Sequence, residues 1–305
     1  MRRFFAIVIF LISTPVIAQD LTILDLDWDE IEPPSSIGFN VAADSLKGRS
    51  SSLDLAIALP NAWSIFASVG QSTYESADRA GSQQRSLTQG AFGFSTDPLA
   101  DFIGSFSVDQ QKSADDFSDG GVETRVVYQP PNGLKSFAFG LGLGARNFSF
   151  KPDPVRGAPK AQYDIPSRSV SVGVDWFVTK RMDVHVEGTR YFYPDEVSTL
   201  REAYVPLFVP SETLNYAFGL PASTFSLAIG SYLPLGDWRK PRIGASISTS
   251  KSVVDDLTTL NTEVSLSLKI LKSLEGRTAL GASRAKDDTG TQPVRSAALS
   301  VAYIW

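Results

Sequence analysis

The most constraining feature of this sequence is a two-residue alternation of apolar and polar side chains that recurs along most of its length. From about residue 37 the alternation comes in segments of about ten residues, separated by clusters of Gly, Pro, Asn, Asp and Ser. Residues 53–59, 122–128 and 264–270 are clear examples. Successive side chains of a β-strand point to opposite faces, so this period predicts strands that are apolar on one face only.

Such strands occur in soluble sandwiches, in propellers and in membrane barrels, and the connections between them help to separate these classes. Short turns alternate with longer polar stretches along the chain. The turns lie at 60–61, 96–98, 130–133 and 179–181, and the polar stretches at 73–83, 110–120 and 151–166. Membrane barrels have short turns at one end and longer loops at the other, so we expect a barrel.

Aromatic residues gather near both kinds of connection. Near the short turns they are Trp63, Phe94, Phe102, Tyr128, Phe137, Trp176, Tyr232 and Trp238, and near the long stretches Phe148, Phe150, Tyr191 and Phe192. Aromatic side chains concentrate at the two interfaces of a bilayer. We therefore expect two aromatic belts.

The carboxyl terminus carries the most specific signal. Residues 297–305 have an apolar or aromatic side chain at every second position and end in Tyr303, Ile304 and Trp305. In this the chain resembles the bacterial outer-membrane β-barrel class, whose last strand ends in an aromatic residue. The resemblance implies that Tyr303 and Trp305 form an insertion signal read by the barrel-insertion machinery. It also implies the outer membrane of a Gram-negative bacterium as the location.

The amino terminus has the order of a secretory signal peptide. Arg2 and Arg3 precede an apolar stretch at 4–12, and Ala18 supplies a small residue at the expected cleavage site. We expect residues 1–18 to be removed, 19–36 to form an acidic periplasmic segment and 37–305 to form the barrel. Residues 20–34 could be a loose tail, a plug of the barrel or a docking peptide for a periplasmic partner, and the sequence leaves these open.

Counting strands backwards from the carboxyl terminus and forwards from the short turns predicts fourteen, an even number as the class requires. The two counts agree only if 194–223 is one long external excursion, with a hairpin of its own around 214–220. Counts of twelve or sixteen remain open. A closed barrel pairs every backbone group without a long apolar run, which suits a chain with 43% hydrophobic residues.

Side chains of the polar parity are expected to line the lumen. Acidic residues outnumber basic ones in this set, which fits either mutually paired wall residues or a weakly cation-preferring pore. Small residues at 138–144 and 173 suggest a close approach by another backbone, with 20–34 as a candidate. The expected lumen residues are Asp54, Asp101, Asp109, Glu123, Arg125, Asp175, Asp183, His185, Glu187, Glu263 and Lys269, together with Arg146, Arg242 and Arg277.

Five basic residues fall on the lipid-facing parity close to external loops. Charges are tolerated there near an interface, and Arg suits pairing with phosphate. Contact with lipopolysaccharide phosphates and ordinary snorkelling into water are both compatible with this placement. The five residues are Arg168, Arg190, Lys251, Arg284 and Arg295.

Several chemistries are excluded by composition. The chain has no Cys and one His, which removes thiol chemistry, disulfides and Cys/His metal clusters. It contains no glycine-rich phosphate loop, zinc motif, calcium loop or basic nucleic-acid patch, so we expect no metal, no cofactor and no nucleic-acid partner. His185 is the only candidate base for a Ser/His hydrolase, and its inward parity differs from the lipid-facing sites of outer-membrane lipid hydrolases.

The sequence therefore predicts an all-β, antiparallel transmembrane barrel that passes small solutes passively and is not an enzyme. Three alternatives remain: a non-conducting scaffold or surface-recognition protein that uses the 194–223 loop, a transporter of an apolar substrate, and a lipid hydrolase that uses His185. Both a monomer and a trimer are compatible with the pattern.

Overall fold

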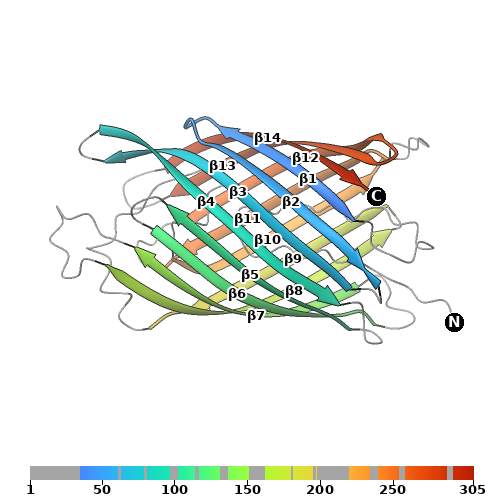
Figure 1. The fold of residues 1–305 in the computed structure, drawn as a ribbon, viewed down its shortest axis with the longest axis horizontal. Helices are drawn as coiled ribbons and strands as arrows, with labels where there is room; N and C mark the ends of the chain where they lie inside the picture. Colours follow the sequence, from blue (N-terminus) through green and yellow to red (C-terminus); the bar gives the residue numbers. More distant parts are fainter. Residues whose placement is uncertain are drawn as a thin grey trace.

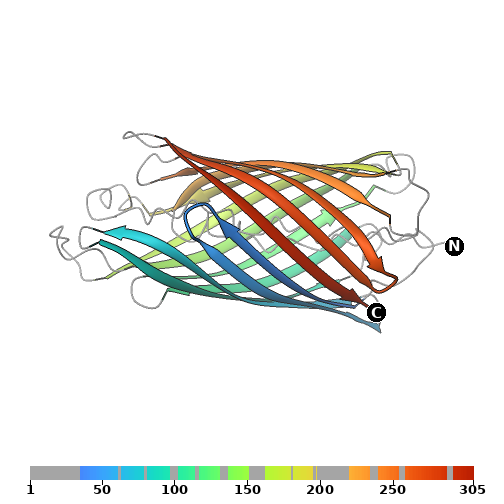
Figure 2. The same cartoon turned by 90° about the horizontal axis from the view of Figure 1, so that it is seen from above.

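The computed structural model describes residues 35–60, 63–78, 81–96, 102–113, 117–130, 137–150, 162–179, 181–194, 197, 220–233, 240–253, 258–286 and 291–305. They form fourteen strands in one closed antiparallel barrel, in which each strand pairs with its neighbours in the chain and β1 pairs with β14. The strands are tilted against the long axis of the barrel, and the termini of the described chain, Ser35 and Trp305, lie at the same end (Figures 1 and 2). The predicted fold class and strand count are confirmed.

The strands are of similar length, with the longest at β3, β4 and β8. Their bounds are β1 Ser36–Asp44, β2 Arg49–Leu59, β3 Trp63–Asp78, β4 Gly81–Thr96, β5 Phe102–Ser113, β6 Phe117–Tyr128, β7 Phe137–Phe150, β8 Tyr163–Thr179, β9 Met182–Phe192, β10 Pro221–Tyr232, β11 Arg242–Ser252, β12 Thr258–Leu271, β13 Leu274–Lys286 and β14 Thr291–Ile304.

The first and last strands close the barrel. Their register runs from Ser36 opposite Ile304 to Asp44 opposite Ser296. Beyond it, Ser35 N donates to Trp305 O at 3.1 Å and Trp305 N donates to Ser35 O at 3.0 Å. Closure leaves no strand edge with unpaired backbone groups, which a chain surrounded by lipid could not tolerate.

Side-chain exposure follows the two-residue period around the barrel. Leu141, Val172, Val264 and Leu280 are exposed, although they are large and apolar. Their chain neighbours on the other parity, such as Ser171 and Ser265, are buried. The apolar parity therefore faces outward, as lipid requires, and the polar parity faces the lumen.

Two of the predicted long loops are wrong. β3 continues to Asp78 and β4 begins at Gly81, while β5 ends at Ser113 and β6 begins at Phe117. The stretches 73–83 and 110–120 are therefore mostly strand, because polar side chains do not interrupt a ladder of backbone hydrogen bonds. The connection after β7 is shorter than predicted, since β8 starts at Tyr163.

The predicted excursion at 194–223 falls in the connection between β9 and β10, most of which lies outside the described residues. β9 ends at Phe192 and β10 begins at Pro221, and this is the longest connection between two strands. Most of the predicted hairpin around 214–220 lies outside the described residues, as does the whole of residues 1–34. The signal peptide and the three roles considered for 20–34 therefore stay predictions.

An aromatic girdle covers part of the circumference at the end of the barrel that carries the termini, on β3 to β8 and at the end of β14. Its rings meet in pairs across neighbouring strands, and their centroids lie 4.9 Å apart for Phe102 and Tyr128 and 5.6 Å apart for the stacked rings of Phe137 and Trp176. Trp63 and Phe94 form a third pair, at 5.8 Å. The predicted belt near the short turns is thus confirmed for these residues, while Trp238 lies outside the described residues.

The predicted second belt is wrong for two of its members. Phe148 and Tyr191 have the inward parity of their strands, and Phe148 is only 2% exposed. Phe192 faces outward, and nothing is described of the Phe150 side chain. At the end with the termini, Tyr232 also faces inward, and the guanidinium carbon of Arg242 lies 5.8 Å from its ring centroid.

Candidate functional site

The charged side chains of the polar parity form the candidate site on the lumen wall. All of the predicted lumen residues within the described chain lie on the inward face, since they alternate with exposed outward residues and pair with inward residues of neighbouring strands. They are Asp54, Asp109, Glu123, Arg125, Asp175, Asp183, His185, Glu187, Glu263 and Lys269, whereas Asp101 lies outside the described residues.

Arg125 forms an ion pair that crosses two intervening strands. It projects from β6, and its Nη1 donates to Glu187 on β9. The crossing is possible because Gly140 on β7 and Gly173 on β8 have no side chain. A Cβ at these positions would lie 2.8 Å and 2.7 Å from the Arg125 Nη2 atom. The glycines were expected to admit another backbone, but at these two positions it is a guanidinium that comes close.

Arg242 repeats the same arrangement elsewhere on the wall. It projects from β11, and its Nη2 donates to both carboxylate oxygens of Asp183 on β9, at 2.9 Å and 2.8 Å. The strand between them, β10, contributes Gly230, where a Cβ would clash with the Arg242 guanidinium. Glycine on an inward position therefore serves as the gap through which an arginine reaches sideways.

Arg146 forms a third set of ion pairs on the inner face. Its Nη2 donates to Asp109 on β5 at 2.7 Å and 2.8 Å, and its Nη1 donates to Asp119 on β6 at 2.5 Å. Gly121 provides the room, because a Cβ there would lie 3.0 Å from the Arg146 guanidinium. Asp119 was not among the predicted site residues, since it fell in the stretch read as a loop. Alternate residues of a strand share a face, so extending the inward series of Gly121, Glu123 and Arg125 by one more step would have placed Asp119 on the inward face.

His185 extends the Arg125 pair into a network. Its Nδ1 lies 2.6 Å from Asp175 Oδ1, and its Nε2 lies 3.9 Å from Glu187 Oε2. Arg125, Glu187, His185 and Asp175 thus form one continuous charged group across β6, β8 and β9. Among the described residues no hydroxyl group hydrogen-bonds to Nε2, so the Ser/His pair required of a hydrolase is not assembled at this histidine.

The remaining predicted carboxylates have nearby partners as well. Arg277 Nη2 donates to Glu263 Oε1 at 2.5 Å, and Asn40 Nδ2 donates to Asp54. Arg125 and Arg242 are each about 5% exposed, so their pairs are largely shielded from water. Removal of one partner of such a pair leaves an uncompensated charge and is strongly destabilising. The pairs therefore fix the inner wall as well as charge it.

Apolar side chains interrupt the polar parity near both ends of the barrel. Ile103, Val127 and Ala138 form a buried inward cluster toward the end with the termini. Toward the opposite end the inward and buried residues include Leu87, Phe148 and Ile165. The sequence did not lead us to predict these inward apolar groups, because we treated the inward parity as mainly polar.

The predicted lipid-facing cations lie where they were expected. Arg168, Arg190, Lys251, Arg284 and Arg295 are all exposed, all on the outward parity and all toward the ends of their strands away from the termini. Lys112 on β5 has the same placement and was not predicted. Tyr303 and Trp305, the predicted insertion signal, face outward in the girdle with ring centroids 5.9 Å apart.

Comparison with known proteins shows similarity in fold only. No protein-family profile matches the chain. No curated protein matches it either. Among solved structures, a chain described as the CymD monoaromatic hydrocarbon channel is similar with a TM-score of 0.57 and 9% identity, over 96% of this chain and 91% of that one.

Two further structures are similar over nearly their whole length. The Pseudomonas putida toluene transporter TodX has a TM-score of 0.54 and 10% identity, over 100% of this chain and 96% of that one. A bacterial polysaccharide outer membrane secretin has a TM-score of 0.52 and 7% identity, over 90% and 100%. The predicted resemblance to the outer-membrane β-barrel class is confirmed at the level of the fold.

Proposed function

We propose that this protein is an outer-membrane channel through which small solutes diffuse passively. The observation that carries the proposal is a closed barrel of fourteen strands whose inward face is charged and whose outward face is apolar. Such a barrel shields a polar path from lipid. The similar solved structures that are described as a channel and a transporter support the same role, and their names imply no particular solute for this chain.

A weak preference for cations follows from the inward charges. Carboxylates exceed cationic side chains among the described inward residues, so the arginine pairs neutralise only part of the negative charge, and the surplus attracts cations along the lumen. The inward acids are Asp44, Asp54, Asp109, Asp119, Glu123, Asp175, Asp183, Glu187, Glu263 and Glu275, and the inward bases are Arg125, Arg146, Arg242, Lys269 and Arg277.

Reconstitution tests the channel directly. Purified mature protein in planar bilayers is expected to give discrete conductance steps, and liposomes that contain it should swell in an isotonic solution of a small sugar. A matched preparation of heat-unfolded protein is the control. Barrels that insert and resist protease but neither conduct nor admit sugar would contradict the proposal, and would favour the scaffold or surface-recognition role.

An apolar substrate is the second candidate, favoured by the inward apolar residues at the end opposite the termini. Leu87, Phe148 and Ile165 are buried on the inward face, so a solute such as toluene would reach an apolar environment where their packing opens. Uptake of radiolabelled toluene by cells that express the protein should then fall on substitution of Phe148 by Asn, while sugar permeation should remain. Equal uptake with and without the protein would argue against this candidate.

We further propose that the outward cations contact lipopolysaccharide. Arg168, Arg190, Lys251, Arg284 and Arg295 lie exposed on the lipid-facing parity, at the level where an anionic headgroup would lie. Substitution of all five by Gln should preserve folding in neutral detergent and lower the amount of lipopolysaccharide that co-purifies. Undiminished co-purification would leave only snorkelling into water.

The insertion signal is a separate proposal. Tyr303 and Trp305 present two stacked outward rings on the strand that closes the barrel. Deletion of Trp305 should slow assembly by the insertion machinery in cells more than it slows spontaneous refolding into detergent. Equal slowing in both settings would mean that the rings stabilise the barrel and do not act as a signal.

A further inference from the structure

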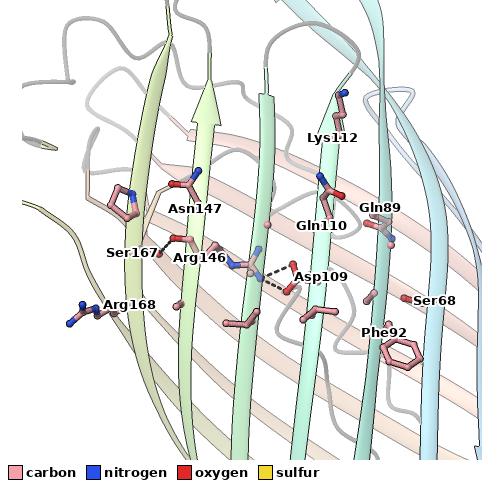
Figure 3. Close-up of a pocket in the computed structure, with 18 of the residues that line it drawn as sticks. Ser68, Gln89, Phe92, Asp109, Gln110, Lys112, Arg146, Asn147, Ser167 and Arg168 are labelled. Carbon is pink, nitrogen blue, oxygen red and sulfur yellow. Dashed lines mark hydrogen bonds and ion pairs between the residues drawn. The ribbon is translucent and has the colours of Figure 1, made fainter.

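The outer face of the barrel is hollowed between β4 and β8. The hollow has a volume of about 1330 Å³, and its lining includes residues of the outward parity on five neighbouring strands. Its floor contains Gly90, Gly120 and Ala145, whose small size lowers the wall between larger neighbours. In Figure 3 the view is onto this wall, with Lys112, Gln110 and Asn147 toward one end and Phe92 farther along.

The lining changes from polar to apolar along the barrel axis. Three successive rows of paired residues show the change. The row nearest the end of the strands contains Thr88 and Lys112, and the next contains Gln110, Gly120 and Asn147. The third contains Phe92, Val108, Val122 and Ala145, and it ends at Arg168 on β8. A polar region directly above an apolar region matches the two halves of a membrane lipid.

The charged side chains around the hollow indicate which class of lipid fits it. Lys112 and Arg168 are exposed cations at two edges of the hollow, and the acid among the lining residues, Asp109, faces inward and is held by Arg146. The amide side chains of Gln110 and Asn147 add hydrogen-bond donors between these cations. Two copies of this face turned toward each other would bring like charges together, which disfavours a self-associating surface.

We propose that the hollow is a defined binding site for one molecule of lipopolysaccharide, with anionic groups of lipid A at Lys112 and at Arg168, on opposite edges of the hollow, and an acyl chain over Gly90, Gly120 and Ala145. This rests on the proposed contact between the outward cations and lipopolysaccharide, and makes it specific. An acyl chain in the hollow fills a space that would otherwise lack dispersion contacts on the lipid side.

Two kinds of substitution separate a built site from a diffuse cationic belt. The charge variant is Lys112→Gln with Arg168→Gln, and its matched control is Arg49→Gln with Lys286→Gln, which removes two exposed outward cations away from the hollow. The steric variant is Gly90→Leu with Gly120→Leu, which fills the floor and keeps both cations. A Cβ at Gly90 or Gly120 would lie 3.7 Å or 3.6 Å from its nearest heavy atom, so the barrel can accept these side chains.

Native mass spectrometry of protein extracted in mild detergent counts the lipopolysaccharide molecules that stay bound. The amount of one-to-one complex should fall at least tenfold in the charge variant and in the steric variant. It should be unchanged in the control pair. Heat-modifiable migration in gels checks that each variant is folded. Retention of the complex in the steric variant would overturn the proposed site.

Other outcomes are equally informative. Equal loss in the charge variant and the control pair would contradict the site but support the diffuse belt. No loss in any variant, or no bound lipopolysaccharide in the wild type, would contradict both. A dimer or trimer that the steric variant dissociates would identify the hollow as a contact between copies and overturn the lipid assignment.

Discussion

Arginine has opposite surroundings on the two faces of the barrel wall. Arg125 and Arg242 face inward, are about 5% exposed and reach a carboxylate across one or two strands. Arg168 and Arg190 face outward and are exposed beside apolar residues of the same parity. Side-chain parity alone decides the difference, because a one-residue shift in register would exchange the two groups. The inner arginines organise the wall, and the outer ones meet the surroundings of the barrel.

The largest effect should come from closing a gap that an inner arginine uses. The substitution Gly230→Leu would displace Arg242 from Asp183 and leave the buried guanidinium without its carboxylate, at a cost of about 3–5 kcal/mol of unfolding free energy. Urea unfolding in detergent measures it. The matched control is Gly188→Leu on the outward face of β9, where a Cβ would meet nothing within 4 Å. Equal destabilisation by both substitutions would refute the role of the gap.

A smaller loss of unfolding free energy is expected for Arg125→Gln. Gln is shorter and uncharged and so cannot reach Glu187 across Gly140 and Gly173, while His185 and Asp175 stay in place beside Glu187. Loss of a hydrogen bond to a charged group costs about 1.5–3 kcal/mol. The double variant Arg125→Gln with Glu187→Gln should recover part of this loss, as a double-mutant cycle of unfolding free energies would show. Strict additivity would mean that the pair contributes no coupling.

The aromatic girdle should contribute less per pair than the buried charges. Trp176→Leu removes the stacked contact with Phe137, for which about 0.5–1.5 kcal/mol beyond area burial is expected. Thermal unfolding in bilayers of defined lipid provides the measurement. Phe225→Leu, an outward substitution in the middle of β10, is the control. A larger effect for Phe225 than for Trp176 would indicate that the girdle does not stabilise the barrel.

The smallest effect on stability should come from the outer cations. Any one of Arg190, Lys251 or Arg284 replaced by Gln should change the unfolding free energy in neutral detergent by no more than about 0.5 kcal/mol, because these side chains are exposed. Unfolding curves at low and high salt would check this. A loss comparable to that of Arg125→Gln would remove the distinction between the two faces.

The alternation of side chains, together with the spacing of the turns and the aromatic carboxyl terminus, predicted the barrel, fourteen strands and the inward parity of the charged residues. It did not predict which charges meet, because Arg125 and Glu187 lie on strands that are not neighbours, and their pairing depends on glycines in the two strands between. It also misplaced Asp119, since local polarity was taken to end a strand. The hollow at Gly90 and Gly120 was missed because it depends on the relative size of residues on five strands.

The reversal potential in a potassium chloride gradient tests the account of the lumen most directly. Wild-type protein in planar bilayers should show a potential that favours potassium over chloride, because inward carboxylates exceed inward cations. Arg125→Gln should shift the potential further toward potassium, and Glu187→Gln should shift it toward chloride. A wild-type potential that favours chloride, or variants that leave the potential unchanged, would contradict the claim that these wall charges face the path of the ions.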